Sequence, residues 1–412
     1  MLPLYIDPGT GSMLFTVAIG LFTTLYFVGK AVILKIKFIL SGGKSSQSIT
    51  NKVAFTIYSE GVQYWNVFKP ILNEFEERKV SVQYLTSSES DPFFSENYQY
   101  ISGEYIGEGN KAFARLNFLE SDICLMTTPG LDVYQLKRSR GVKHYSHILH
   151  AVDDATGYRL FGLDYFDSVL LSGEYQKDHI RKLEKLRNIK EKKLIVVGCP
   201  YLDVLSQKVE LIEQRKDTFT VLVAPSWGAN GILSKYGERL LTPLQKTGFS
   251  VIVRPHPQTK KSETAMLETL MEQFADCSNV SWDFERENLL TLSRADIMIS
   301  DFSGVIFDYT FLFDRPFLYV NASFDSRPYD AWDIPEESWK FRILPKIGVE
   351  LKEEQFPIIK QVLLDAAQDD ELRTNREIAK NTAWQYRQES GKRVCDYLIE
   401  KQAYLESGTF SD

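Results

Sequence analysis

The sequence predicts an α/β protein with two domains, each built on a parallel sheet covered by helices, and a transmembrane helix before them. Three observations lead to this fold class. A chain of 412 residues is long enough for two domains or more. Short β-rich runs alternate with helical stretches along most of its length, a pattern typical of parallel sheets with helices on both faces. One long apolar run without charge lies near the N-terminus.

Composition and charge narrow the classes of protein to consider. The chain is 44% hydrophobic and 25% charged, which suits a globular protein with a sizeable core. Its net charge is −7, so composition gives no support for nucleic acid as a partner. The 4 cysteines are far apart and form no CxxC pair, so we expect reduced cysteines in a cytosolic domain, with neither a disulfide framework nor a zinc site.

The first predicted element is a membrane anchor within residues 1–50. Residues 13–29 carry no charge and approach the length of a spanning helix. The only charge before them is Asp7, and the lysines all follow them, at Lys30, Lys35, Lys37, Lys44 and Lys52. The positive-inside rule then predicts a single-pass anchor in the cytoplasmic (inner) membrane, with the rest of the chain on the cytoplasmic side. A helix buried in the globular core is the alternative. Residues 41–46 are typical of a flexible linker.

The first α/β domain is predicted over residues 51–205. Its helical spacing is clearest over residues 65–78. Its strand candidates are short β-rich runs at residues 53–57, 80–85, 123–126, 147–150, 168–171 and 194–197.

The second α/β domain is predicted over residues 206–365, and its series of strands begins after a polar helical stretch at residues 203–217. From about Lys352 the pattern is mostly polar and helical, and we assign residues 366–412 to C-terminal helices. The strand candidates of this domain lie at residues 219–223, 249–253, 295–299 and 316–320.

Two polar segments directly follow buried strands of the second domain. Arg254-Pro255-His256-Pro257 follows the strand at 249–253, and Ser300-Asp301-Phe302-Ser303-Gly304 follows the strand at 295–299. Ligands of open α/β sheets bind just beyond the carboxyl ends of the strands. Arginine offers a fork of donors to phosphate oxygens, and the N-terminus of a helix offers backbone N–H groups and a positive dipole. The two segments therefore predict a site for an anionic, nucleotide-linked substrate.

Both segments also have simpler explanations. Ser303 or Asp301 can serve only as the cap of the following helix. Arg254 can pair with a carboxylate such as Asp301. His256 between two prolines is harder to explain by packing, because the prolines fix the backbone and withhold N–H donors.

Three further positions at strand ends are candidates. His150 ends the strand candidate at 147–150, and a histidine there can accept a proton from an attacking hydroxyl or be a structural, hydrogen-bonded side chain. Ser226 and Trp227 follow the strand at 219–223 and are typical of either a nucleotide contact or a tight turn. Asp153-Asp154 can hold a divalent ion, although paired carboxylates are more often turn residues.

Cofactor motifs are missing from the sequence. No GxGxxG follows the first strand candidate, which counts against a nicotinamide or flavin enzyme. We expect no cofactor and leave a divalent metal ion open.

These motifs together resemble the CDP-glycerol glycerophosphotransferase family, the membrane-associated teichoic-acid primases and polymerases. The resemblance is strongest over residues 219–321. It rests on Ala224-Pro225-Ser226-Trp227, Arg254-Pro255-His256-Pro257 and Ser300-Asp301-Phe302-Ser303, with Asp308 further along. It implies two Rossmann-like domains facing across a cleft, the glycosyltransferase-B (GT-B) type. The first half departs from the family pattern, because Ala151 replaces a glycine and Ala155 stands near the position of an expected lysine. In the second half, Gly304 replaces a serine.

The resemblance also implies roles for the candidate residues. His150 would be the catalytic base, and His256 would act beside it in catalysis. The substrate-binding residues would be Arg254, Ser226, Trp227, Ser300, Asp301, Ser303, Gly304 and Asp308.

The implied reaction moves a polyol phosphate, glycerol phosphate in the first instance, from a CDP-linked donor. The acceptor would be a hydroxyl of a lipid-linked molecule or glycan at the membrane, and CMP would leave. One alternative is a GT-B glycosyltransferase or a sugar-nucleotide 2-epimerase acting on a nucleotide sugar. The other is a membrane-tethered scaffold or nucleotide sensor without catalysis, because fold does not imply function.

Overall fold

The computed structural model describes residues Leu25, Gly29, 53–212, 218–321, 324–369 and 371–408. The predicted anchor at 13–29, apart from Leu25 and Gly29, lies outside these residues, as does the linker at 41–46. Among the helices that are described, none combines the length and apolar character needed to cross a bilayer. The anchor therefore stays a prediction.

The first sheet has seven parallel strands in the order β3-β2-β1-β4-β5-β6-β7. Its strands are β1 (Val53–Ser59), β2 (Val82–Thr86), β3 (Ile101–Tyr105), β4 (Glu120–Met126), β5 (Gly141–Ile148), β6 (Ser168–Leu171) and β7 (Lys193–Val196).

The second sheet has six parallel strands in the order β10-β9-β8-β11-β12-β13. Its strands are β8 (Thr220–Val223), β9 (Ser250–Val253), β10 (Val280–Trp282), β11 (Ile297–Ser300), β12 (Phe317–Tyr319) and β13 (Val349–Glu350). This order repeats that of the first six strands of the other sheet.

The predicted α/β class with parallel sheets is confirmed, with local corrections. The sequence pattern missed β3, β10 and β13, which are edge strands or are only two or three residues long. It also extended the strand before His150 too far, because β5 ends at Ile148 and His150 lies in the loop beyond it. The first sheet ends at Val196 and the second begins at Thr220, on either side of the predicted boundary at 205/206.

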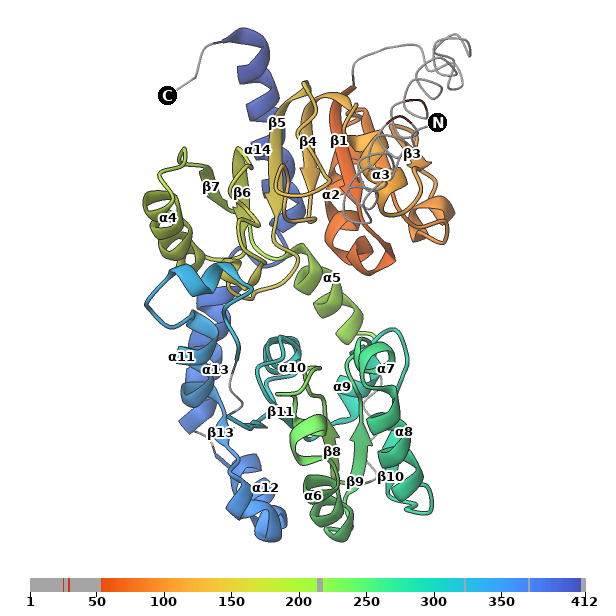
Figure 1. The fold of residues 1–412 in the computed structure, drawn as a ribbon, viewed down its shortest axis with the longest axis vertical. Coiled ribbons are helices and arrows are strands. Elements are labelled where there is room, and N and C mark those ends of the chain that lie inside the picture. The colour runs from red at the N-terminus through yellow and green to blue at the C-terminus, as the bar shows by residue number, and fades with distance from the viewer. Residues whose placement is uncertain are drawn as a thin grey trace, which may run out of the picture. The chain divides into compact units, whose positions relative to one another are not determined.

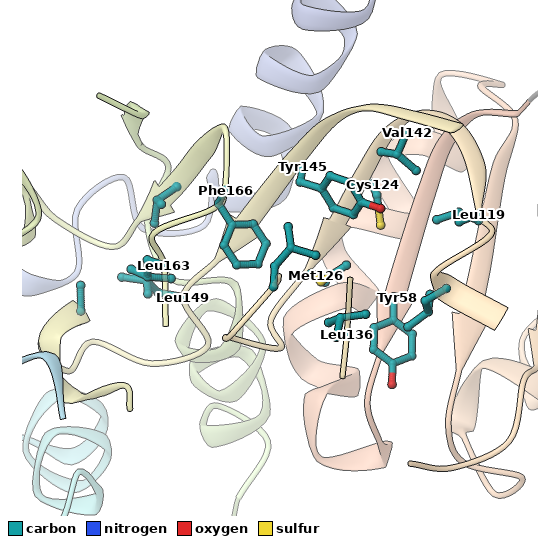
Figure 2. Packing of buried hydrophobic residues seen from close by; sticks show 14 of the residues in the cluster. Tyr58, Leu119, Cys124, Met126, Leu136, Val142, Tyr145, Leu149, Leu163 and Phe166 are labelled. Carbon is teal, nitrogen blue, oxygen red and sulfur yellow. The ribbon is translucent and has the colours of Figure 1, made fainter. Parts of the chain in front are cut away.

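Alternation along the strands explains why each sheet has two covered faces. In β4, Cys124 and Met126 belong to one buried cluster, whereas Ile123 and Leu125 belong to another on the opposite face. Successive strand residues point to opposite faces, so a run that is apolar at every position must be buried on both. Figure 2 shows the first of these clusters, where Tyr145 and Phe166 lie near Met126.

Helices cover both sheets (Figure 1). Those that follow strands of the first sheet are α2 (Trp65–Glu77), α3 (Asn110–Leu116), α4 (Lys177–Leu186) and α5 (Pro200–Val209). Those of the second half are α6 (Ile232–Lys246), α7 (Thr259–Ser262), α8 (Thr264–Gln273), α9 (Leu289–Arg294), α10 (Val305–Phe313), α11 (Trp339–Ile347), α12 (Ile359–Ala367) and α13 (Glu371–Ala383). The last helix is α14 (Ser390–Ser407), and short 3-10 helices include η1 (Val62–Tyr64), η3 (Ala155–Gly157) and η5 (Asp330–Asp333).

The chain passes between the halves at α5 and returns just before α14. Helix α14 packs against α2 of the first half, where the Cys395 thiol lies 3.4 Å from the Ile71 carbonyl oxygen. The buried carboxylate of Asp203 on α5 ties the two passages together, because it accepts hydrogen bonds from the Trp384 indole (2.8 Å) and the Gln388 backbone (2.9 Å). These contacts fix the connection between the halves at one place.

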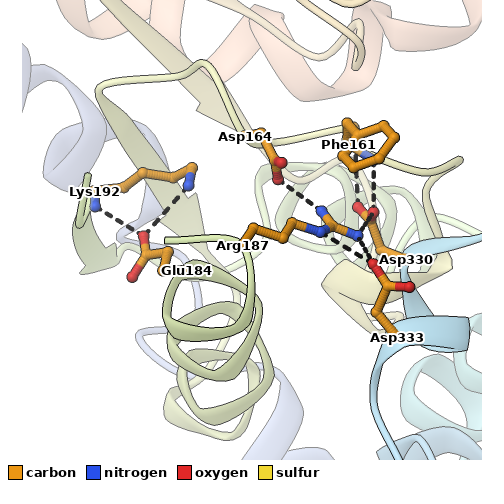
Figure 3. Close-up of polar contacts among 8 residues, drawn as sticks. Phe161, Asp164, Glu184, Arg187, Lys192, Asp330 and Asp333 are labelled. Carbon is orange, nitrogen blue, oxygen red and sulfur yellow. Dashed lines mark hydrogen bonds and ion pairs between the residues drawn. The ribbon is translucent and has the colours of Figure 1, made fainter. Parts of the chain in front are cut away.

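A segment after β12 makes a second connection, which we call the strap (residues 324–340). The Leu160 N–H donates to the Pro328 carbonyl oxygen at 3.1 Å, so the strap pairs with the loop after β5. Arg187, just past α4, donates at 2.7 Å to Asp164 of that loop and at 2.7 Å to Asp330 of the strap (Figure 3). The loop that carries His150 is therefore held to the second half through buried ion pairs.

Candidate functional site

A cavity of about 270 Å³ lies beyond the carboxyl ends of the second sheet and reaches the first half. Arg254 and His256 line it from one motif, and Ser303 lines it from the other. Val62 and Gln63 of η1 line it from the first half. The two polar motifs therefore share one cavity between the halves, which we call the cleft cavity.

His256 has a defined protonation state in this cavity. Its Nδ1 accepts a hydrogen bond from the Gln258 backbone N–H at 3.1 Å. A neutral imidazole that accepts at Nδ1 carries its proton on Nε2. Burial lowers the pKa of His256, which favours this neutral form at pH 7. The ring can therefore donate one hydrogen bond from Nε2 to an anionic oxygen.

Arg254 pairs with a carboxylate, as in the simpler explanation given for this residue. The partner is Asp283, however, and not Asp301. Its guanidinium pairs with Asp283, and its Nη2 donates to the Glu285 carbonyl oxygen at 2.6 Å. Burial opposes ionisation of Asp283, yet hydrogen bonds, that of Arg254 among them, outweigh it and lower the pKa of Asp283. Arg254 thus holds the 283–285 loop at the wall of the cavity, and a contact with phosphate stays a prediction.

Asp301 holds together the two loops that border the cavity. Its Oδ1 accepts from the backbone N–H groups of Ser226 (2.9 Å) and Ser303 (3.1 Å), and its Oδ2 accepts from that of Ile232 (3.2 Å). Only 1% of the residue is exposed. Ser300 is also buried, and its hydroxyl donates to the Ala224 carbonyl oxygen at 2.6 Å. Asp301 and Ser300 therefore shape the site from within, and direct substrate contact by either stays untested.

Helix α10 opens towards the cavity with Ser303 and Gly304. Gly304 is the N-cap residue, and no described side chain caps this end. The first N–H groups of a helix lack intrahelical acceptors, and the helix dipole is positive there. A phosphate oxygen would supply the acceptor that these groups need.

Asp308 lies one turn further along α10, below the cavity. Its Oδ2 accepts from the Tyr201 hydroxyl at 3.3 Å. Burial raises the pKa of Asp308 to about 7, although hydrogen bonds from Tyr201 and Asn288 act in the opposite direction. Both of these partners line the cavity. Neither residue was predicted from the sequence, and the one signal for Tyr201 was its place directly after Gly198-Cys199-Pro200.

Trp227 lies at the edge of the site. It is 46% exposed, and its ring centroid is 6.4 Å from that of His256. The neighbouring Gly228 N–H donates to Glu263 at 2.9 Å, which fixes the loop. A large aromatic ring left exposed beside a polar cavity suits stacking against a nucleobase.

His150 lies on the first half, in a group of aromatic side chains. Its ring contacts that of Tyr64, with centroids 5.3 Å apart. The Tyr158 hydroxyl lies 3.4 Å from His150 Nδ1 and 3.1 Å from His147 Nε2. That hydroxyl has one proton, so it can donate to only one of the two histidines. Burial lowers the pKa of His150, so the ring is neutral at pH 7.

Two contacts relate His150 to the cleft cavity. Tyr64, which touches His150, ends the 3-10 helix η1 whose other residues line the cavity. Asp153, three residues after His150, has a carboxylate oxygen 3.6 Å from where a Cβ on Gly304 would lie. The loop that carries His150 therefore approaches the start of α10, although His150 itself does not line the cleft cavity.

Asp153 and Asp154 bind protein groups. Asp154 accepts from the backbone N–H groups of Trp339 (2.9 Å) and Lys340 (2.8 Å) at the start of α11. Asp153 pairs with the Lys340 amine at 2.6 Å. Within the described part of the chain, no group of three or more His, Cys, Asp or Glu side chains is placed to hold a metal ion. A requirement for a divalent ion stays open.

Solved structures of two kinds share this fold. The wall teichoic acid polymerase TagF, soaked with CDPG, superposes with a TM-score of 0.57 and 13% identity over 92% of this chain and 98% of that one. The UDP-GlcNAc 2-epimerase of Methanocaldococcus jannaschii, in complex with UDP-GlcNAc and UDP, gives a TM-score of 0.55 and 13% identity over 84% of this chain and 99% of that one. At this identity the likeness concerns the fold alone. The curated proteins contain no match to the chain.

A family profile decides between these kinds. The profile of the CDP-glycerol:poly(glycerophosphate) glycerophosphotransferase family matches residues 164–398. This range holds the whole second half, and with it both motifs of the cleft cavity. The match spans more than half of the chain, which therefore belongs to the CDP-glycerol:poly(glycerophosphate) glycerophosphotransferase family of enzymes.

Proposed function

We propose that this enzyme transfers glycerol phosphate from CDP-glycerol to a hydroxyl of a lipid-linked or glycan acceptor in teichoic-acid synthesis, and releases CMP. The observation that carries the proposal is that the His256 loop and the start of α10 line one cavity in a chain of this family. Two separate donors of hydrogen bonds to phosphate thus face the same space.

The donor would bind with its diphosphate between His256 and the start of α10. His256 would donate from Nε2, and the backbone N–H groups of Gly304 and Val305 at the start of α10 would donate to a second oxygen. Trp227, exposed beside His256, would stack on the cytosine. Arg254 would contribute through the loop that it holds.

The reaction would be a direct displacement at the β-phosphorus. The acceptor oxygen forms a bond to that phosphorus, and the bond from the phosphorus to the oxygen of CMP breaks. His150 takes the acceptor's proton at Nε2, and the bonding electron pair leaves with CMP. Positioned donors stabilise the charge that spreads over the phosphoryl oxygens.

His150 can act as a base only in one tautomer. Its Nε2 is free if Nδ1 carries the proton and donates it to the Tyr158 hydroxyl, 3.4 Å away. Tyr158 would then donate its own proton to His147. Opening of the cleft around Tyr64 would bring the acceptor to His150, which is consistent with the lid and domain motions common in transferases.

The acceptor would be presented at the cytoplasmic face of the membrane. The support for this is the sequence pattern of residues 13–29 and the lysines that follow. An anchored enzyme meets a lipid-linked acceptor at a high effective concentration.

A panel of labelled donors tests the proposal. Full-length protein in bilayers is incubated with CDP-glycerol, CDP-ribitol, UDP-GlcNAc and CMP-linked sugars, and the released nucleotides are separated. We expect CMP from CDP-glycerol only. Release of UDP from UDP-GlcNAc would instead favour a nucleotide-sugar enzyme, and no turnover of any donor would favour a scaffold.

A further inference from the structure

A second, larger cavity lies on the first half, at the edge of the sheet opposite to the cleft. Its volume is about 970 Å³. Its walls come from the starts of β5, β6 and β7 and from α14. Strand β5 has 8 residues, so the two edges of the sheet are separated by roughly 26 Å. No step of the proposed transfer uses this cavity.

Basic side chains dominate the lining of this cavity. It has six basic residues and three carboxylates, Asp167, Glu191 and Glu400. The six are Lys143, Arg181, Lys190, Lys192, Lys193 and Lys401. An excess of basic groups in a protein whose net charge is −7 means that positive charge has been concentrated here.

The partners of these cations differ. Lys192 and Arg181 form ion pairs with the buried Glu184, and Lys143 pairs with Asp122. Lys190 and Lys193 are exposed, and neither has an ion-pair partner among the described residues. These two lysines are the cations available to an anion from solution.

The cations lie close enough to repel one another. Burial lowers the pKa of Lys401, and the charges of Lys190 and Lys193 lower it further, against the effect of Asp167. His144 also lines the cavity, and its pKa is lowered to about 4, chiefly by burial, with further contributions from Lys401 and Lys190. An anionic ligand would relieve this repulsion.

Aromatic side chains complete the surface. Tyr397 and Tyr404 of α14 line the cavity beside the lysines. Phe118 lies two residues before the start of β4, at the same edge of the sheet, and 81% of it is exposed. Tyrosine and exposed aromatic rings next to lysines are typical of protein surfaces that meet the headgroup region of a bilayer.

The position of the cavity favours a membrane lipid over other anionic ligands. The domain begins with Val53, at the start of β1 and at this same edge. Strands β1 and β5 are separated only by β4, so Val53 lies roughly 10 Å from the start of β5. The described chain therefore enters the first half, at Val53, on the edge that carries the basic cavity.

We propose that this basic cavity binds the phosphodiester headgroup of an anionic membrane lipid and so holds the first half against the bilayer surface. The inference deepens the proposed function, because it rests on the membrane attachment assumed there. Lys190 and Lys193 would contact the headgroup phosphate, and the tyrosine hydroxyls would bond to its polar groups. The cleft at the opposite edge would then stay open to donor and acceptor.

Hydrogen–deuterium exchange of the full chain in nanodiscs tests this assignment. One set of discs contains only phosphatidylcholine, and the other contains phosphatidylglycerol as well. We expect slower exchange in residues 188–194 and 398–406 with phosphatidylglycerol, and loss of this protection in high salt. Equal exchange in both discs would overturn the proposal.

Charge reversal locates the effect. The variant Lys190→Glu/Lys193→Glu should lose the protection, because each lysine near an anionic surface contributes about fivefold to affinity. The matched control is Lys246→Glu/Lys352→Glu, which reverses two exposed lysines of the second half and should keep the protection. Equal loss in both variants would show that only net charge matters, which contradicts a site.

Two further experiments complete the test. One distinguishes a lipid phosphate from free phosphate, and the other distinguishes this proposal from the proposed transfer reaction. Protection by millimolar inorganic phosphate in phosphatidylcholine discs would contradict a lipid ligand. Release of CMP with a water-soluble acceptor in detergent should be unchanged in Lys190→Glu/Lys193→Glu. Because the exchange measurement needs no turnover, it stays decisive even if CDP-glycerol proves not to be the donor.

Discussion

The two sheets have the same strand order over six strands, yet their carboxyl edges are built differently. In the second half a buried carboxylate, Asp301, fixes two loops through three backbone N–H groups. In the first half the corresponding edge carries His150 among the rings of Tyr64 and Tyr158. The same topology thus carries loops held by a buried carboxylate on one side, where we propose that the diphosphate binds. On the other side it carries a histidine among aromatic rings, which we propose as the proton acceptor.

The largest expected effect separates the two histidines. His256→Asn removes the Nε2 donor, so turnover of CDP-glycerol should fall by between about 100- and 10,000-fold, with weaker donor binding. His150→Asn should lower kcat within the same range and leave the Kd of the donor unchanged. Steady-state kinetics and calorimetry measure both.

The control for this pair is His179→Asn, a histidine on α4 away from the cleft cavity. It should have turnover within about twofold of the wild type, as expected for a site without a catalytic role. A His150→Asn variant with full activity would remove that residue from the role of base.

Asp301 is the test of rigidity in the second half. Asp301→Ala leaves three backbone N–H groups without their acceptor, and each buried unpaired group costs about 1–3 kcal/mol. We expect the free energy of unfolding to fall by roughly 3 kcal/mol in urea titrations, because the loops relax in part. Asp276→Ala, at an exposed position, should change it by less than about 0.5 kcal/mol. Equal effects of the two would show that Asp301 holds nothing together.

Features formed by residues close together in the sequence were easier to predict than contacts between residues far apart in it. Strand runs and the residues that end them lie close together in sequence, so the cavity edge at 254–257 and 300–304 was predictable. Arg254 and Asp283, which form an ion pair, lie 29 positions apart in the sequence. Asp301 lies 75 positions from Ser226, whose backbone N–H it accepts. Such pairings depend on how the loops pack, which periodicity and turn signals do not encode.

The strap shows the same limit more strongly. Asp330 accepts from the Phe161 backbone N–H at 2.7 Å, across 169 residues, and nothing in the local pattern of either segment predicts it. Likewise, the strand before His150 was predicted to run to residue 150, whereas β5 ends at Ile148 and His150 lies in the following loop. Local patterns gave the layers, whereas the contacts that position His150 come from tertiary packing.

A substitution of Tyr158 tests how the hydrogen bond to His150 contributes to catalysis in the first half. Tyr158→Phe removes the hydroxyl next to His150 Nδ1, and kcat should fall by about tenfold, as for a lost hydrogen bond, with donor Kd unchanged. Tyr165→Phe, at an exposed position, is the control.

Nitrogen NMR of the histidines gives the more specific readout. If His150 is the base, both His150 and His147 must be protonated at Nδ1. The Nδ1 of His147 has no hydrogen-bond partner among the described residues. Leaving that N–H unpaired costs about 1–3 kcal/mol, which the donor complex must offset. A His150 protonated at Nε2 in the donor complex would contradict its role as base.

Asp308 gives the smallest effect, a dependence on pH. Its pKa of about 7 lies above the ordinary value, so the folded state binds this proton more tightly than the unfolded state does. The stability that this provides is full at low pH and is lost as the pH rises through about 7. Asp308→Asn should therefore gain stability relative to the wild type as the pH rises from 4 to 8, with the two about equal at pH 4.

Thermal unfolding across this pH range measures the difference. Asp276→Asn should show no such trend, because its carboxylate is exposed. A parallel pH dependence in wild type and Asp308→Asn would mean that Asp308 stays ionised in the cleft.

The most direct test of the account compares the affinities of CDP and CMP for the full chain by calorimetry. If His256 and the start of α10 grip a diphosphate, CDP should bind at least about tenfold more tightly than CMP, the value of one charge-assisted hydrogen bond. In His256→Asn this ratio should approach one. Equal affinities of CDP and CMP for the wild type would contradict a diphosphate site in the cleft cavity.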